Sequence, residues 1–81
     1  MHKRKAKVRL GETVIKVINY SLITLRDNYI HFVTDCKSII KLYLPMEKLN
    51  SVLKQLESNK AVDLTRYLGT SSLEYKTLLV A

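Results

Sequence analysis

The stretch RDNYIHFVTDCKSIIKLYLPMEKL, residues 26–49, constrains the fold more than any other part of the chain. It holds two segments in which apolar side chains alternate, Tyr29–Thr34 and Ile39–Leu44, separated by the polar residues 35–38. Alternation with a period of two is typical of a half-buried strand, and a polar break between two such runs favours a hairpin. We therefore predict two antiparallel strands here, with one face in the core.

Pro45 marks the change from strand to helix. Proline cannot donate to a sheet ladder, but its backbone dihedral angle suits the first position of a helix. The apolar residues that follow fall on one stripe of a helix over residues 45–59: Met46, Leu49, Val52, Leu53 and Leu56. We expect this stripe to pack on the sheet, because little else in the chain could cover it.

The flanking segments supply further strands. Thr13–Tyr20 is rich in β-branched residues and indicates a strand, and the polar break at residues 19–21 allows either a tight turn or a bulge within one bent strand. Leu73–Val80 also favours a strand, whereas Ala61–Leu68 fits either a strand or a short helix. The sequence thus predicts a single α+β domain over residues 11–81. We expect a small antiparallel sheet of four or five strands with one packed amphipathic helix.

Positive charge is concentrated at the N-terminus. The chain has 14 Lys and Arg against 7 Asp and Glu, which gives a formal net charge of +7. Five of the cations precede Gly11: Lys3, Arg4, Lys5, Lys7 and Arg9. We predict a basic, flexible arm over residues 1–10 that neutralises nucleic-acid phosphates, with each contact adding to affinity and to its salt dependence. The alternative is a solubilising terminus that binds nothing.

No set of residues has the spacing of a catalytic or metal site. Cys36 is the one cysteine, and a nucleophilic thiolate needs a base that a third group orients, which the sequence does not provide. His31 has only His2 as a companion, too few for the usual zinc ligand set. Two glycines cannot build a phosphate-binding loop. We expect a protein that is not an enzyme and has no cofactor, no metal and no small-molecule substrate.

The sequence also carries information on compartment. It has no apolar run near the roughly 18 residues that span a bilayer, and its charged N-terminus leads into a strand-like segment without the apolar core of a signal peptide. A single cysteine excludes an internal disulfide framework and agrees with a reducing environment. We therefore expect a cytoplasmic protein without a membrane partner.

A basic and aromatic strand face offers a second nucleic-acid surface. Tyr29 and His31 share one face of their strand, and Lys41 and Tyr43 share one face of the next. Such a face can stack single-stranded bases, which makes RNA binding an alternative function. The same residue types also occur on the solvent side of ordinary antiparallel sheets.

The segment from about Ile15 to the helix MEKLNSVLKQL resembles the front half of LytTR-type DNA-binding domains of bacterial response regulators. The matching residues are Leu22, Ile23, Asn28, Tyr29, Ile30, Phe32, Thr34, Asp35, Lys37, Ser38, Leu44 and that helix. The resemblance implies a mostly β fold that acts in transcription regulation, with loops between strands entering successive major grooves. It also implies that Asn28, in the loop before a strand, contacts DNA. After the helix, only Arg66 and Tyr67 compare with the family's Arg-His-Arg-Ser-Tyr segment.

We therefore predict a small basic DNA-binding protein involved in bacterial or phage transcription regulation, with duplex DNA as its partner. The five N-terminal cations would contact phosphates, and Asn28, Lys37 and neighbouring loops would lie near base edges. Lys41 completes the set of candidate nucleic-acid-binding residues. The alternative from another class is a non-enzymatic interaction module that homodimerises, or augments a partner's sheet, through the strand at Leu73–Val80.

Overall fold

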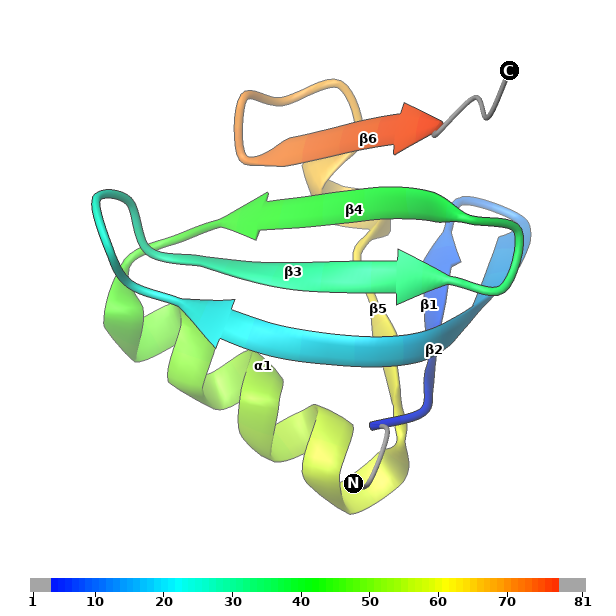
Figure 1. Cartoon of the computed structure of the whole chain (residues 1–81), viewed down its shortest axis with the longest axis horizontal. Coiled ribbons are helices and arrows are strands. Elements are labelled where there is room, and N and C mark those ends of the chain that lie inside the picture. The colour runs from blue at the N-terminus through cyan, green and yellow to red at the C-terminus, as the bar shows by residue number, and fades with distance from the viewer. Residues whose placement is uncertain (1–3, 78–81) are drawn as a thin grey trace.

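The computed structural model describes residues 4–77, which form a six-stranded sheet with an α-helix packed on one face (Figure 1). The elements are β1 (Ala6–Leu10), β2 (Thr13–Ile23), β3 (Tyr29–Thr34), β4 (Ser38–Tyr43), α1 (Met46–Asn59), β5 (Ala61–Asp63), a 3-10 turn η1 (Thr65–Tyr67) and β6 (Leu73–Thr77). The strand order across the sheet is β5-β1-β2-β3-β4-β6. The helix is neither long nor apolar enough to cross a membrane, and no other candidate span occurs among the described residues.

The α+β class and the single packed helix are confirmed. The sheet has six strands where the sequence predicted four or five, and it is mixed rather than antiparallel, because β5 runs parallel to β1. The Lys7 amide donates to the Lys60 carbonyl at 2.9 Å, and the Leu64 amide donates to the Arg9 carbonyl at 2.9 Å. Parallel strands need a long connection, and here residues 11–60, which hold β2, β3, β4 and α1, provide it.

Residues 6–10 form β1, a strand between β5 and β2, so the predicted flexible arm over residues 1–10 is wrong for this segment. Ala6 and Val8 are buried, whereas Lys7 and Arg9, which alternate with them, are exposed. AKVRL therefore alternates with the period of a half-buried strand. The high density of cations obscures this alternation, because the apolar positions are few and one of them is only an alanine.

β2 is one bent strand of 11 residues with a bulge at Ile18. The pairing with β3 passes from Val17 opposite Thr34 to Asn19 opposite Val33, so β2 has one residue more than β3 at this point. The extra residue keeps both Val17 and Tyr20 on the buried face. The structure thus selects the bulge over the tight turn. The bend lets the first half of β2 pair with β1 and the second half with β3, and β1 and β5 cross the direction of β3 and β4 (Figure 1).

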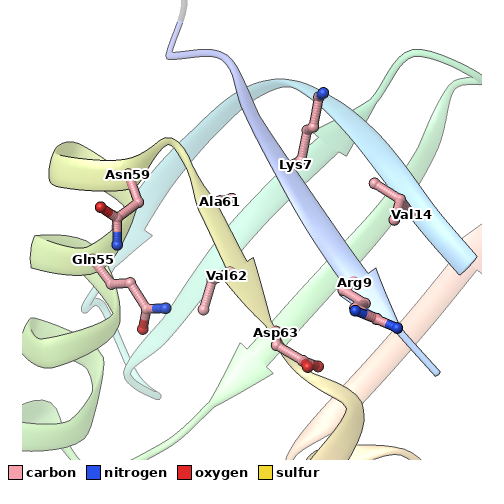
Figure 2. A pocket seen from close by; sticks show the side chains of 8 residues that line it. All are labelled: Lys7, Arg9, Val14, Gln55, Asn59, Ala61, Val62 and Asp63. Atoms are coloured by element: carbon pink, nitrogen blue, oxygen red, sulfur yellow. The ribbon is translucent and has the colours of Figure 1, made fainter. Parts of the chain in front are cut away.

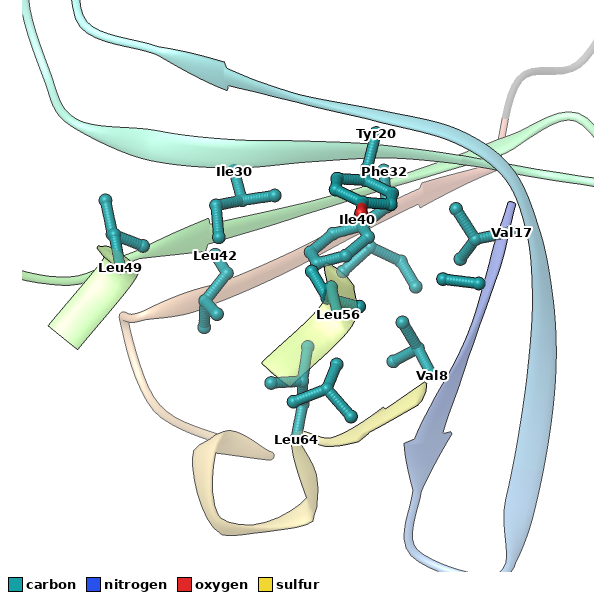
Figure 3. Close-up of a cluster of buried hydrophobic side chains, with 12 residues drawn as sticks. Val8, Val17, Tyr20, Ile30, Phe32, Ile40, Leu42, Leu49, Leu56 and Leu64 are labelled. Atoms are coloured by element: carbon teal, nitrogen blue, oxygen red, sulfur yellow. The ribbon is translucent and has the colours of Figure 1, made fainter. Parts of the chain in front are cut away.

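The helix begins and ends close to the predicted limits of residues 45–59. Its amides at Lys48 and Leu49 donate to the Pro45 carbonyl, and Lys60 ends it in a left-handed conformation with φ 54°. Leu49 and Leu56 are fully buried in the core cluster between α1 and the sheet (Figure 3). The remaining core residues are Ala6, Val8, Val17, Tyr20, Ile30, Phe32, Ile40, Leu42, Val62 and Leu64. We call the opposite side of the sheet the helix-free face.

The structure also shows how the predicted hairpin, the ambiguous segment 61–68 and the predicted C-terminal strand are folded. β3 and β4 pair antiparallel, with Ile30 opposite Leu42 and Phe32 opposite Ile40. The ambiguous segment 61–68 contains both a short strand, β5, and the 3-10 turn η1. The predicted strand at Leu73–Val80 is confirmed as β6 up to Thr77, and its last three positions lie outside the described residues.

Candidate nucleic-acid interface

Three cations form a strip on the helix-free face of β1 and β2. Lys7 and Arg9 project from β1 between its buried positions, and both side chains are drawn in Figure 2. Lys16 of β2 is the direct cross-strand partner of Lys7. Lys7 uses its backbone amide on the β5 side, so the Lys7–Lys16 pair is the closely spaced, non-hydrogen-bonded kind. We call Lys7, Arg9 and Lys16 the basic strip.

The basic strip is not neutralised by ion pairs. Within residues 4–77 the one ion pair joins Lys76 and Glu74, on the opposite edge of the sheet. Two lysines directly opposite each other on neighbouring strands repel and destabilise the sheet. A bound anion such as a phosphate would relieve this repulsion, so the arrangement favours an anionic partner.

Asp63 is a carboxylate beside the basic strip, because it is the strand partner of Arg9. Its oxygen Oδ1 accepts a hydrogen bond from the Thr65 amide at 2.9 Å. Hydrogen bonds from the Thr65 side chain and backbone lower the pKa of Asp63, and Arg9 adds a smaller effect. Arg9 itself donates from Nε to the Gly11 carbonyl at 3.0 Å. Asp63 therefore mainly stabilises the turn into η1, and the basic strip keeps a net positive charge.

A shallow hollow lies over β5, beside the basic strip (Figure 2). The amides of Gln55 and Asn59 lie on its α1 side, and Lys7 and Arg9 lie on its β1 side. Amide and cationic donors on two sides of the hollow suit a phosphate group, which accepts several hydrogen bonds at once, whereas the Asp63 carboxylate, which also lines the hollow, opposes an anion.

Arg4 and Lys5 lie just before β1, at the other end of this strand from Arg9. The Arg4 amide donates to Oδ1 of Asn19 at 3.1 Å, and its guanidinium lies 5.7 Å from the centroid of the Tyr20 ring. Both cations line a second hollow together with Lys60 at the end of α1. Tyr20 and Leu56 of the core cluster and Glu57 of α1 line the same hollow, so it lies on the helix side of the sheet and not on the face of the basic strip. Lys3, the remaining predicted phosphate contact, lies outside the described residues.

The β3–β4 hairpin brings Lys37 to the same end of the sheet as the basic strip. The Asp35 amide donates to the Lys16 carbonyl at 3.0 Å, so the hairpin lies against β2 beside the strip. Lys37 is exposed and has φ 60°, a left-handed conformation in which hairpins of this kind normally place glycine. A lysine at a position that favours glycine is strained, and such strain is more frequent at functional sites.

Asn28 lies at the opposite end of β3 from Lys37. It is exposed and directly precedes Tyr29. A strand of six residues is about 20 Å long, so the structure separates the two predicted base contacts by at least this distance. Close to Asn28 in the chain, Arg26 lines a hollow together with Lys41. The predicted residues thus form two groups, one at each end of β3.

The four predicted aromatic and basic residues of β3 and β4 do lie together on the helix-free face. The ring centroids of Tyr29 and Tyr43 are 4.9 Å apart, and those of Tyr29 and His31 are 6.5 Å apart. Lys41 Nζ lies 5.3 Å from the centroid of the Tyr29 ring. All four side chains are half-buried, because they pack on one another. We call Tyr29, His31, Lys41 and Tyr43 the aromatic cluster.

The surroundings of His31 in the aromatic cluster disfavour its protonated form. Its atom Nε2 is buried and has no hydrogen-bond partner in the described part of the chain. Burial lowers the pKa of His31, and the positive charge of Lys41 lowers it further. The imidazole ring contributes to the aromatic cluster through its edge contact with Tyr29.

The Cys36 thiol contacts two hydroxyls at the β3–β4 turn. The thiol is exposed and lies 3.4 Å from the Ser38 hydroxyl and 3.3 Å from the Thr34 hydroxyl. These two hydrogen bonds, that of Ser38 first, lower the pKa of Cys36, but neither hydroxyl is a general base. Among residues 4–77 no group of three or more His, Cys, Asp and Glu side chains could hold a metal ion.

The sequence alone did not show that Lys16 lies opposite Lys7 and completes the basic strip. Its role depends on the β1–β2 register, and that register is invisible while residues 1–10 are taken as an arm. The alternation in AKVRL is the signal that could have shown it.

Comparison with known proteins finds no matching family model, no matching curated protein and no matching solved structure. The resemblance to LytTR-type domains therefore stays a prediction based on the sequence pattern.

Proposed function

We propose that this protein binds duplex DNA and acts in bacterial or phage transcription regulation, with the basic strip on the phosphate backbone. One observation carries the proposal: Lys7 and Lys16 face each other across β1 and β2 with Arg9 beside them, and none of the three has an ion-pair partner among residues 4–77. Phosphates neutralise such a row and release the counterions condensed on the DNA.

The two ends of β3 are suited to different parts of one DNA site. Lys37 extends the basic strip at one end of β3. Asn28 lies at the other end of β3, and Lys41 lies on the neighbouring strand β4. A separation of about 20 Å is shorter than one helical turn of DNA, about 34 Å, so both ends can contact one face of the duplex. Phosphate contacts fix the position of the protein, and polar contacts at base edges supply sequence dependence.

The test is a salt titration of binding to duplex DNA, followed by fluorescence anisotropy. We expect Lys7→Gln and Lys16→Gln to weaken binding on every duplex sequence and to reduce the slope of log K against log salt concentration by about 0.9 for each lost phosphate contact. Both substitutions also remove the Lys7–Lys16 repulsion, so the fold is retained. Lys54→Gln, an exposed position on α1, is the matched control and should leave the slope unchanged.

Sequence dependence is tested separately at the loops. Asn28→Ala should reduce discrimination between a selected duplex and a random one while keeping the salt slope, because it removes a polar base contact and no charge. Undetectable duplex binding at about 50 mM salt, or basic-strip variants with the slope of the Lys54→Gln control, would contradict the proposal.

A second candidate function is binding of single-stranded nucleic acid or RNA on the aromatic cluster. The observation in its favour is the packing of Tyr29, His31 and Tyr43 beside Lys41 on a face that no helix covers. Stacking contributes to single-strand binding without reading sequence. If this function holds, Lys41→Gln and Tyr29→Leu lower affinity for single strands more than for duplex DNA, whereas the basic-strip variants do the reverse.

A further inference from the structure

β6 forms an edge of the sheet whose outer side is open. It pairs with β4 on one side and has no neighbour on the other among the described residues, as its place beyond β4 in Figure 1 shows. The other edge strand, β5, has only three residues and leads directly into the η1 turn. An unpaired strand edge is a template for pairing with another chain. β6 is therefore the edge where such pairing can occur.

The register of β4 and β6 determines which backbone groups of β6 point outward. The Tyr43 amide donates to the Ser72 carbonyl at 2.7 Å, so this is a hydrogen-bonded pair. Hydrogen-bonded and non-hydrogen-bonded pairs alternate along an antiparallel ladder, so Glu74 and Lys76 direct their backbone groups to β4. The amides and carbonyls of Tyr75 and Thr77, and the carbonyl of Leu73, consequently point to the open side.

We propose that β6 pairs antiparallel with β6 of a second copy of this chain, about a twofold axis at Tyr75. In this register Tyr75 lies opposite Tyr75 of the second copy, and Leu73 lies opposite Thr77. The outward amides of Tyr75 and Thr77 then meet outward carbonyls of Tyr75 and Leu73. Such an isologous contact closes on itself and joins the two sheets into one.

The side-chain charges select this register. With the axis at Tyr75, Glu74 of each copy lies opposite Lys76 of the other, as a closely spaced, non-hydrogen-bonded pair. An axis at Glu74 would place two glutamates opposite each other, and an axis at Lys76 would place two lysines together. Charged residues normally protect an edge strand from association. On β6 the two charges have opposite sign and flank Tyr75 symmetrically. The charge pattern of one β6 is therefore complementary to that of a second β6 that runs antiparallel to it.

The side chains of β6 leave room for a second strand. Glu74 and Lys76 form an exposed ion pair at 3.1 Å, with side chains 39% and 62% exposed, and are free to rearrange into pairs between copies. The Tyr75 hydroxyl lies 3.0 Å from the Ser38 hydroxyl on β4, which holds the ring toward its own sheet and away from the open edge. The Tyr75 side chain is still 48% exposed, so pairing would cover it.

The dimer should be weak. Pairing of five-residue strands buries less than the roughly 1,200 Å² typical of stable interfaces, so we expect association at tens to hundreds of micromolar. Sedimentation velocity of the full chain without nucleic acid, from about 10 µM to 1 mM, measures this equilibrium directly. A monomer over this whole range overturns the proposal and leaves the DNA-binding proposal untouched.

Charge reversal tests the register. Glu74→Lys alone and Lys76→Glu alone each place like charges opposite one another, and each should weaken self-association at least tenfold. An equimolar mixture of the two single variants restores opposite charges and should form a heterodimer, and the double variant Glu74→Lys with Lys76→Glu should self-associate like the wild type. A dimer that neither single variant weakens, or a mixture that stays monomeric, overturns the Tyr75-centred register.

A backbone variant tests the edge independently of charge. Thr77→Pro removes an outward amide and leaves the β4 ladder intact, because Thr77 and Ser38 form a non-hydrogen-bonded pair. We expect monomers with an unchanged circular dichroism spectrum. Lys48→Glu, a charge reversal on the exposed side of α1, is the control and should leave the dimer unaffected. A Thr77→Pro variant that is folded and still dimerises as the wild type excludes pairing through β6.

Discussion

Thr34 and Ser38 are polar side chains that are fully buried where β3 turns into β4. The Ser38 amide donates to the Thr34 hydroxyl at 3.0 Å, and the Thr34 hydroxyl donates to the Ser38 carbonyl at 3.2 Å. The Ser38 hydroxyl in turn contacts the Tyr75 hydroxyl at 3.0 Å. Two hydroxyls in the core are tolerated because each has partners. They also connect the hairpin to β6.

Thr34→Val keeps the shape of the side chain but removes the acceptor of the buried Ser38 amide. We expect the free energy of unfolding in urea to fall by about 1–3 kcal/mol, the cost of a buried polar group without a partner. Tyr75→Phe is the control, and it should cost less, because Tyr75 is half-exposed and Ser38 keeps Thr34 as a partner. Equal losses in the two variants would contradict this reasoning.

His31 should make the protein less stable in mildly acidic solution. Burial and Lys41 lower the pKa of His31 below its ordinary 6.5, whereas the unfolded chain titrates near that value. Between the two pKa values the unfolded chain binds more protons, so the free energy of unfolding falls as the pH falls through about 6.5. Urea unfolding at pH 7 and at pH 5 measures the difference. His31→Gln should reduce this difference, and a variant with an equal or larger difference would disprove the assignment.

Backbone strain occurs at two lysines, one after the helix and one in the β3–β4 hairpin. Lys60 follows α1 with φ 54°, and Lys37 closes the β3–β4 hairpin with φ 60°. The left-handed conformation costs a residue with a side chain about 1 kcal/mol, and glycine adopts it freely. Lys60 ends the helix with its amide bonded to the Leu56 carbonyl, which is the usual role of glycine. Conformational propensity alone would therefore favour glycine over lysine at positions 37 and 60.

Lys60→Gly should raise the free energy of unfolding by about 0.5–1 kcal/mol, because the relief of strain exceeds the greater freedom of glycine in the unfolded chain. Lys54→Gly, within α1, is the matched control and should lower it by about 1 kcal/mol. Chemical denaturation of both variants beside the wild type provides the comparison. A Lys60→Gly variant less stable than the wild type would show that Lys60 makes a compensating contact.

At the scale of the whole molecule, β1 connects the strands that precede the helix to the strand that follows it. It pairs with β2 on one side and with β5, which follows the helix, on the other. Ala6 and Val8 lie in the same core cluster as Leu49 and Leu56 of the helix. A segment with the composition of a solubilising arm is thus an internal strand of the sheet.

Deletion of residues 1–9 should consequently abolish cooperative unfolding rather than remove a mobile arm. The deletion exposes the inner edges of β2 and β5 and takes Ala6 and Val8 out of a core that is already small for an 81-residue chain. Thermal unfolding followed by circular dichroism distinguishes the two cases. A truncated chain that keeps the sharp transition of the full-length protein would refute the structural role of β1. Phosphate contacts must therefore be tested by single substitutions at Lys7 and Lys16.

The sequence by itself determined the β3–β4 hairpin, the helix after Pro45 and the apolar face on which they pack. These elements follow from local periodicity, and the fully buried Ile30, Phe32, Ile40 and Leu42 are the residues that the alternation predicts. Tyr29, His31, Lys41 and Tyr43 lie together for the same reason, because their strands are neighbours in the chain. The local sequence pattern is sufficient to predict the pairing of two strands when only a short turn separates them.

Only the tertiary structure decided the role of the N-terminal cations. β1 and β5 are more than 50 residues apart in the chain, and β5 has only three residues, so no local signal predicts their parallel pairing. That pairing makes AKVRL an internal strand of the sheet, whereas the separate antiparallel pairing of β1 with β2 places Lys7 opposite Lys16. The physical reason is that long-range strand pairing depends on the total core that several elements bury together, which no single segment encodes.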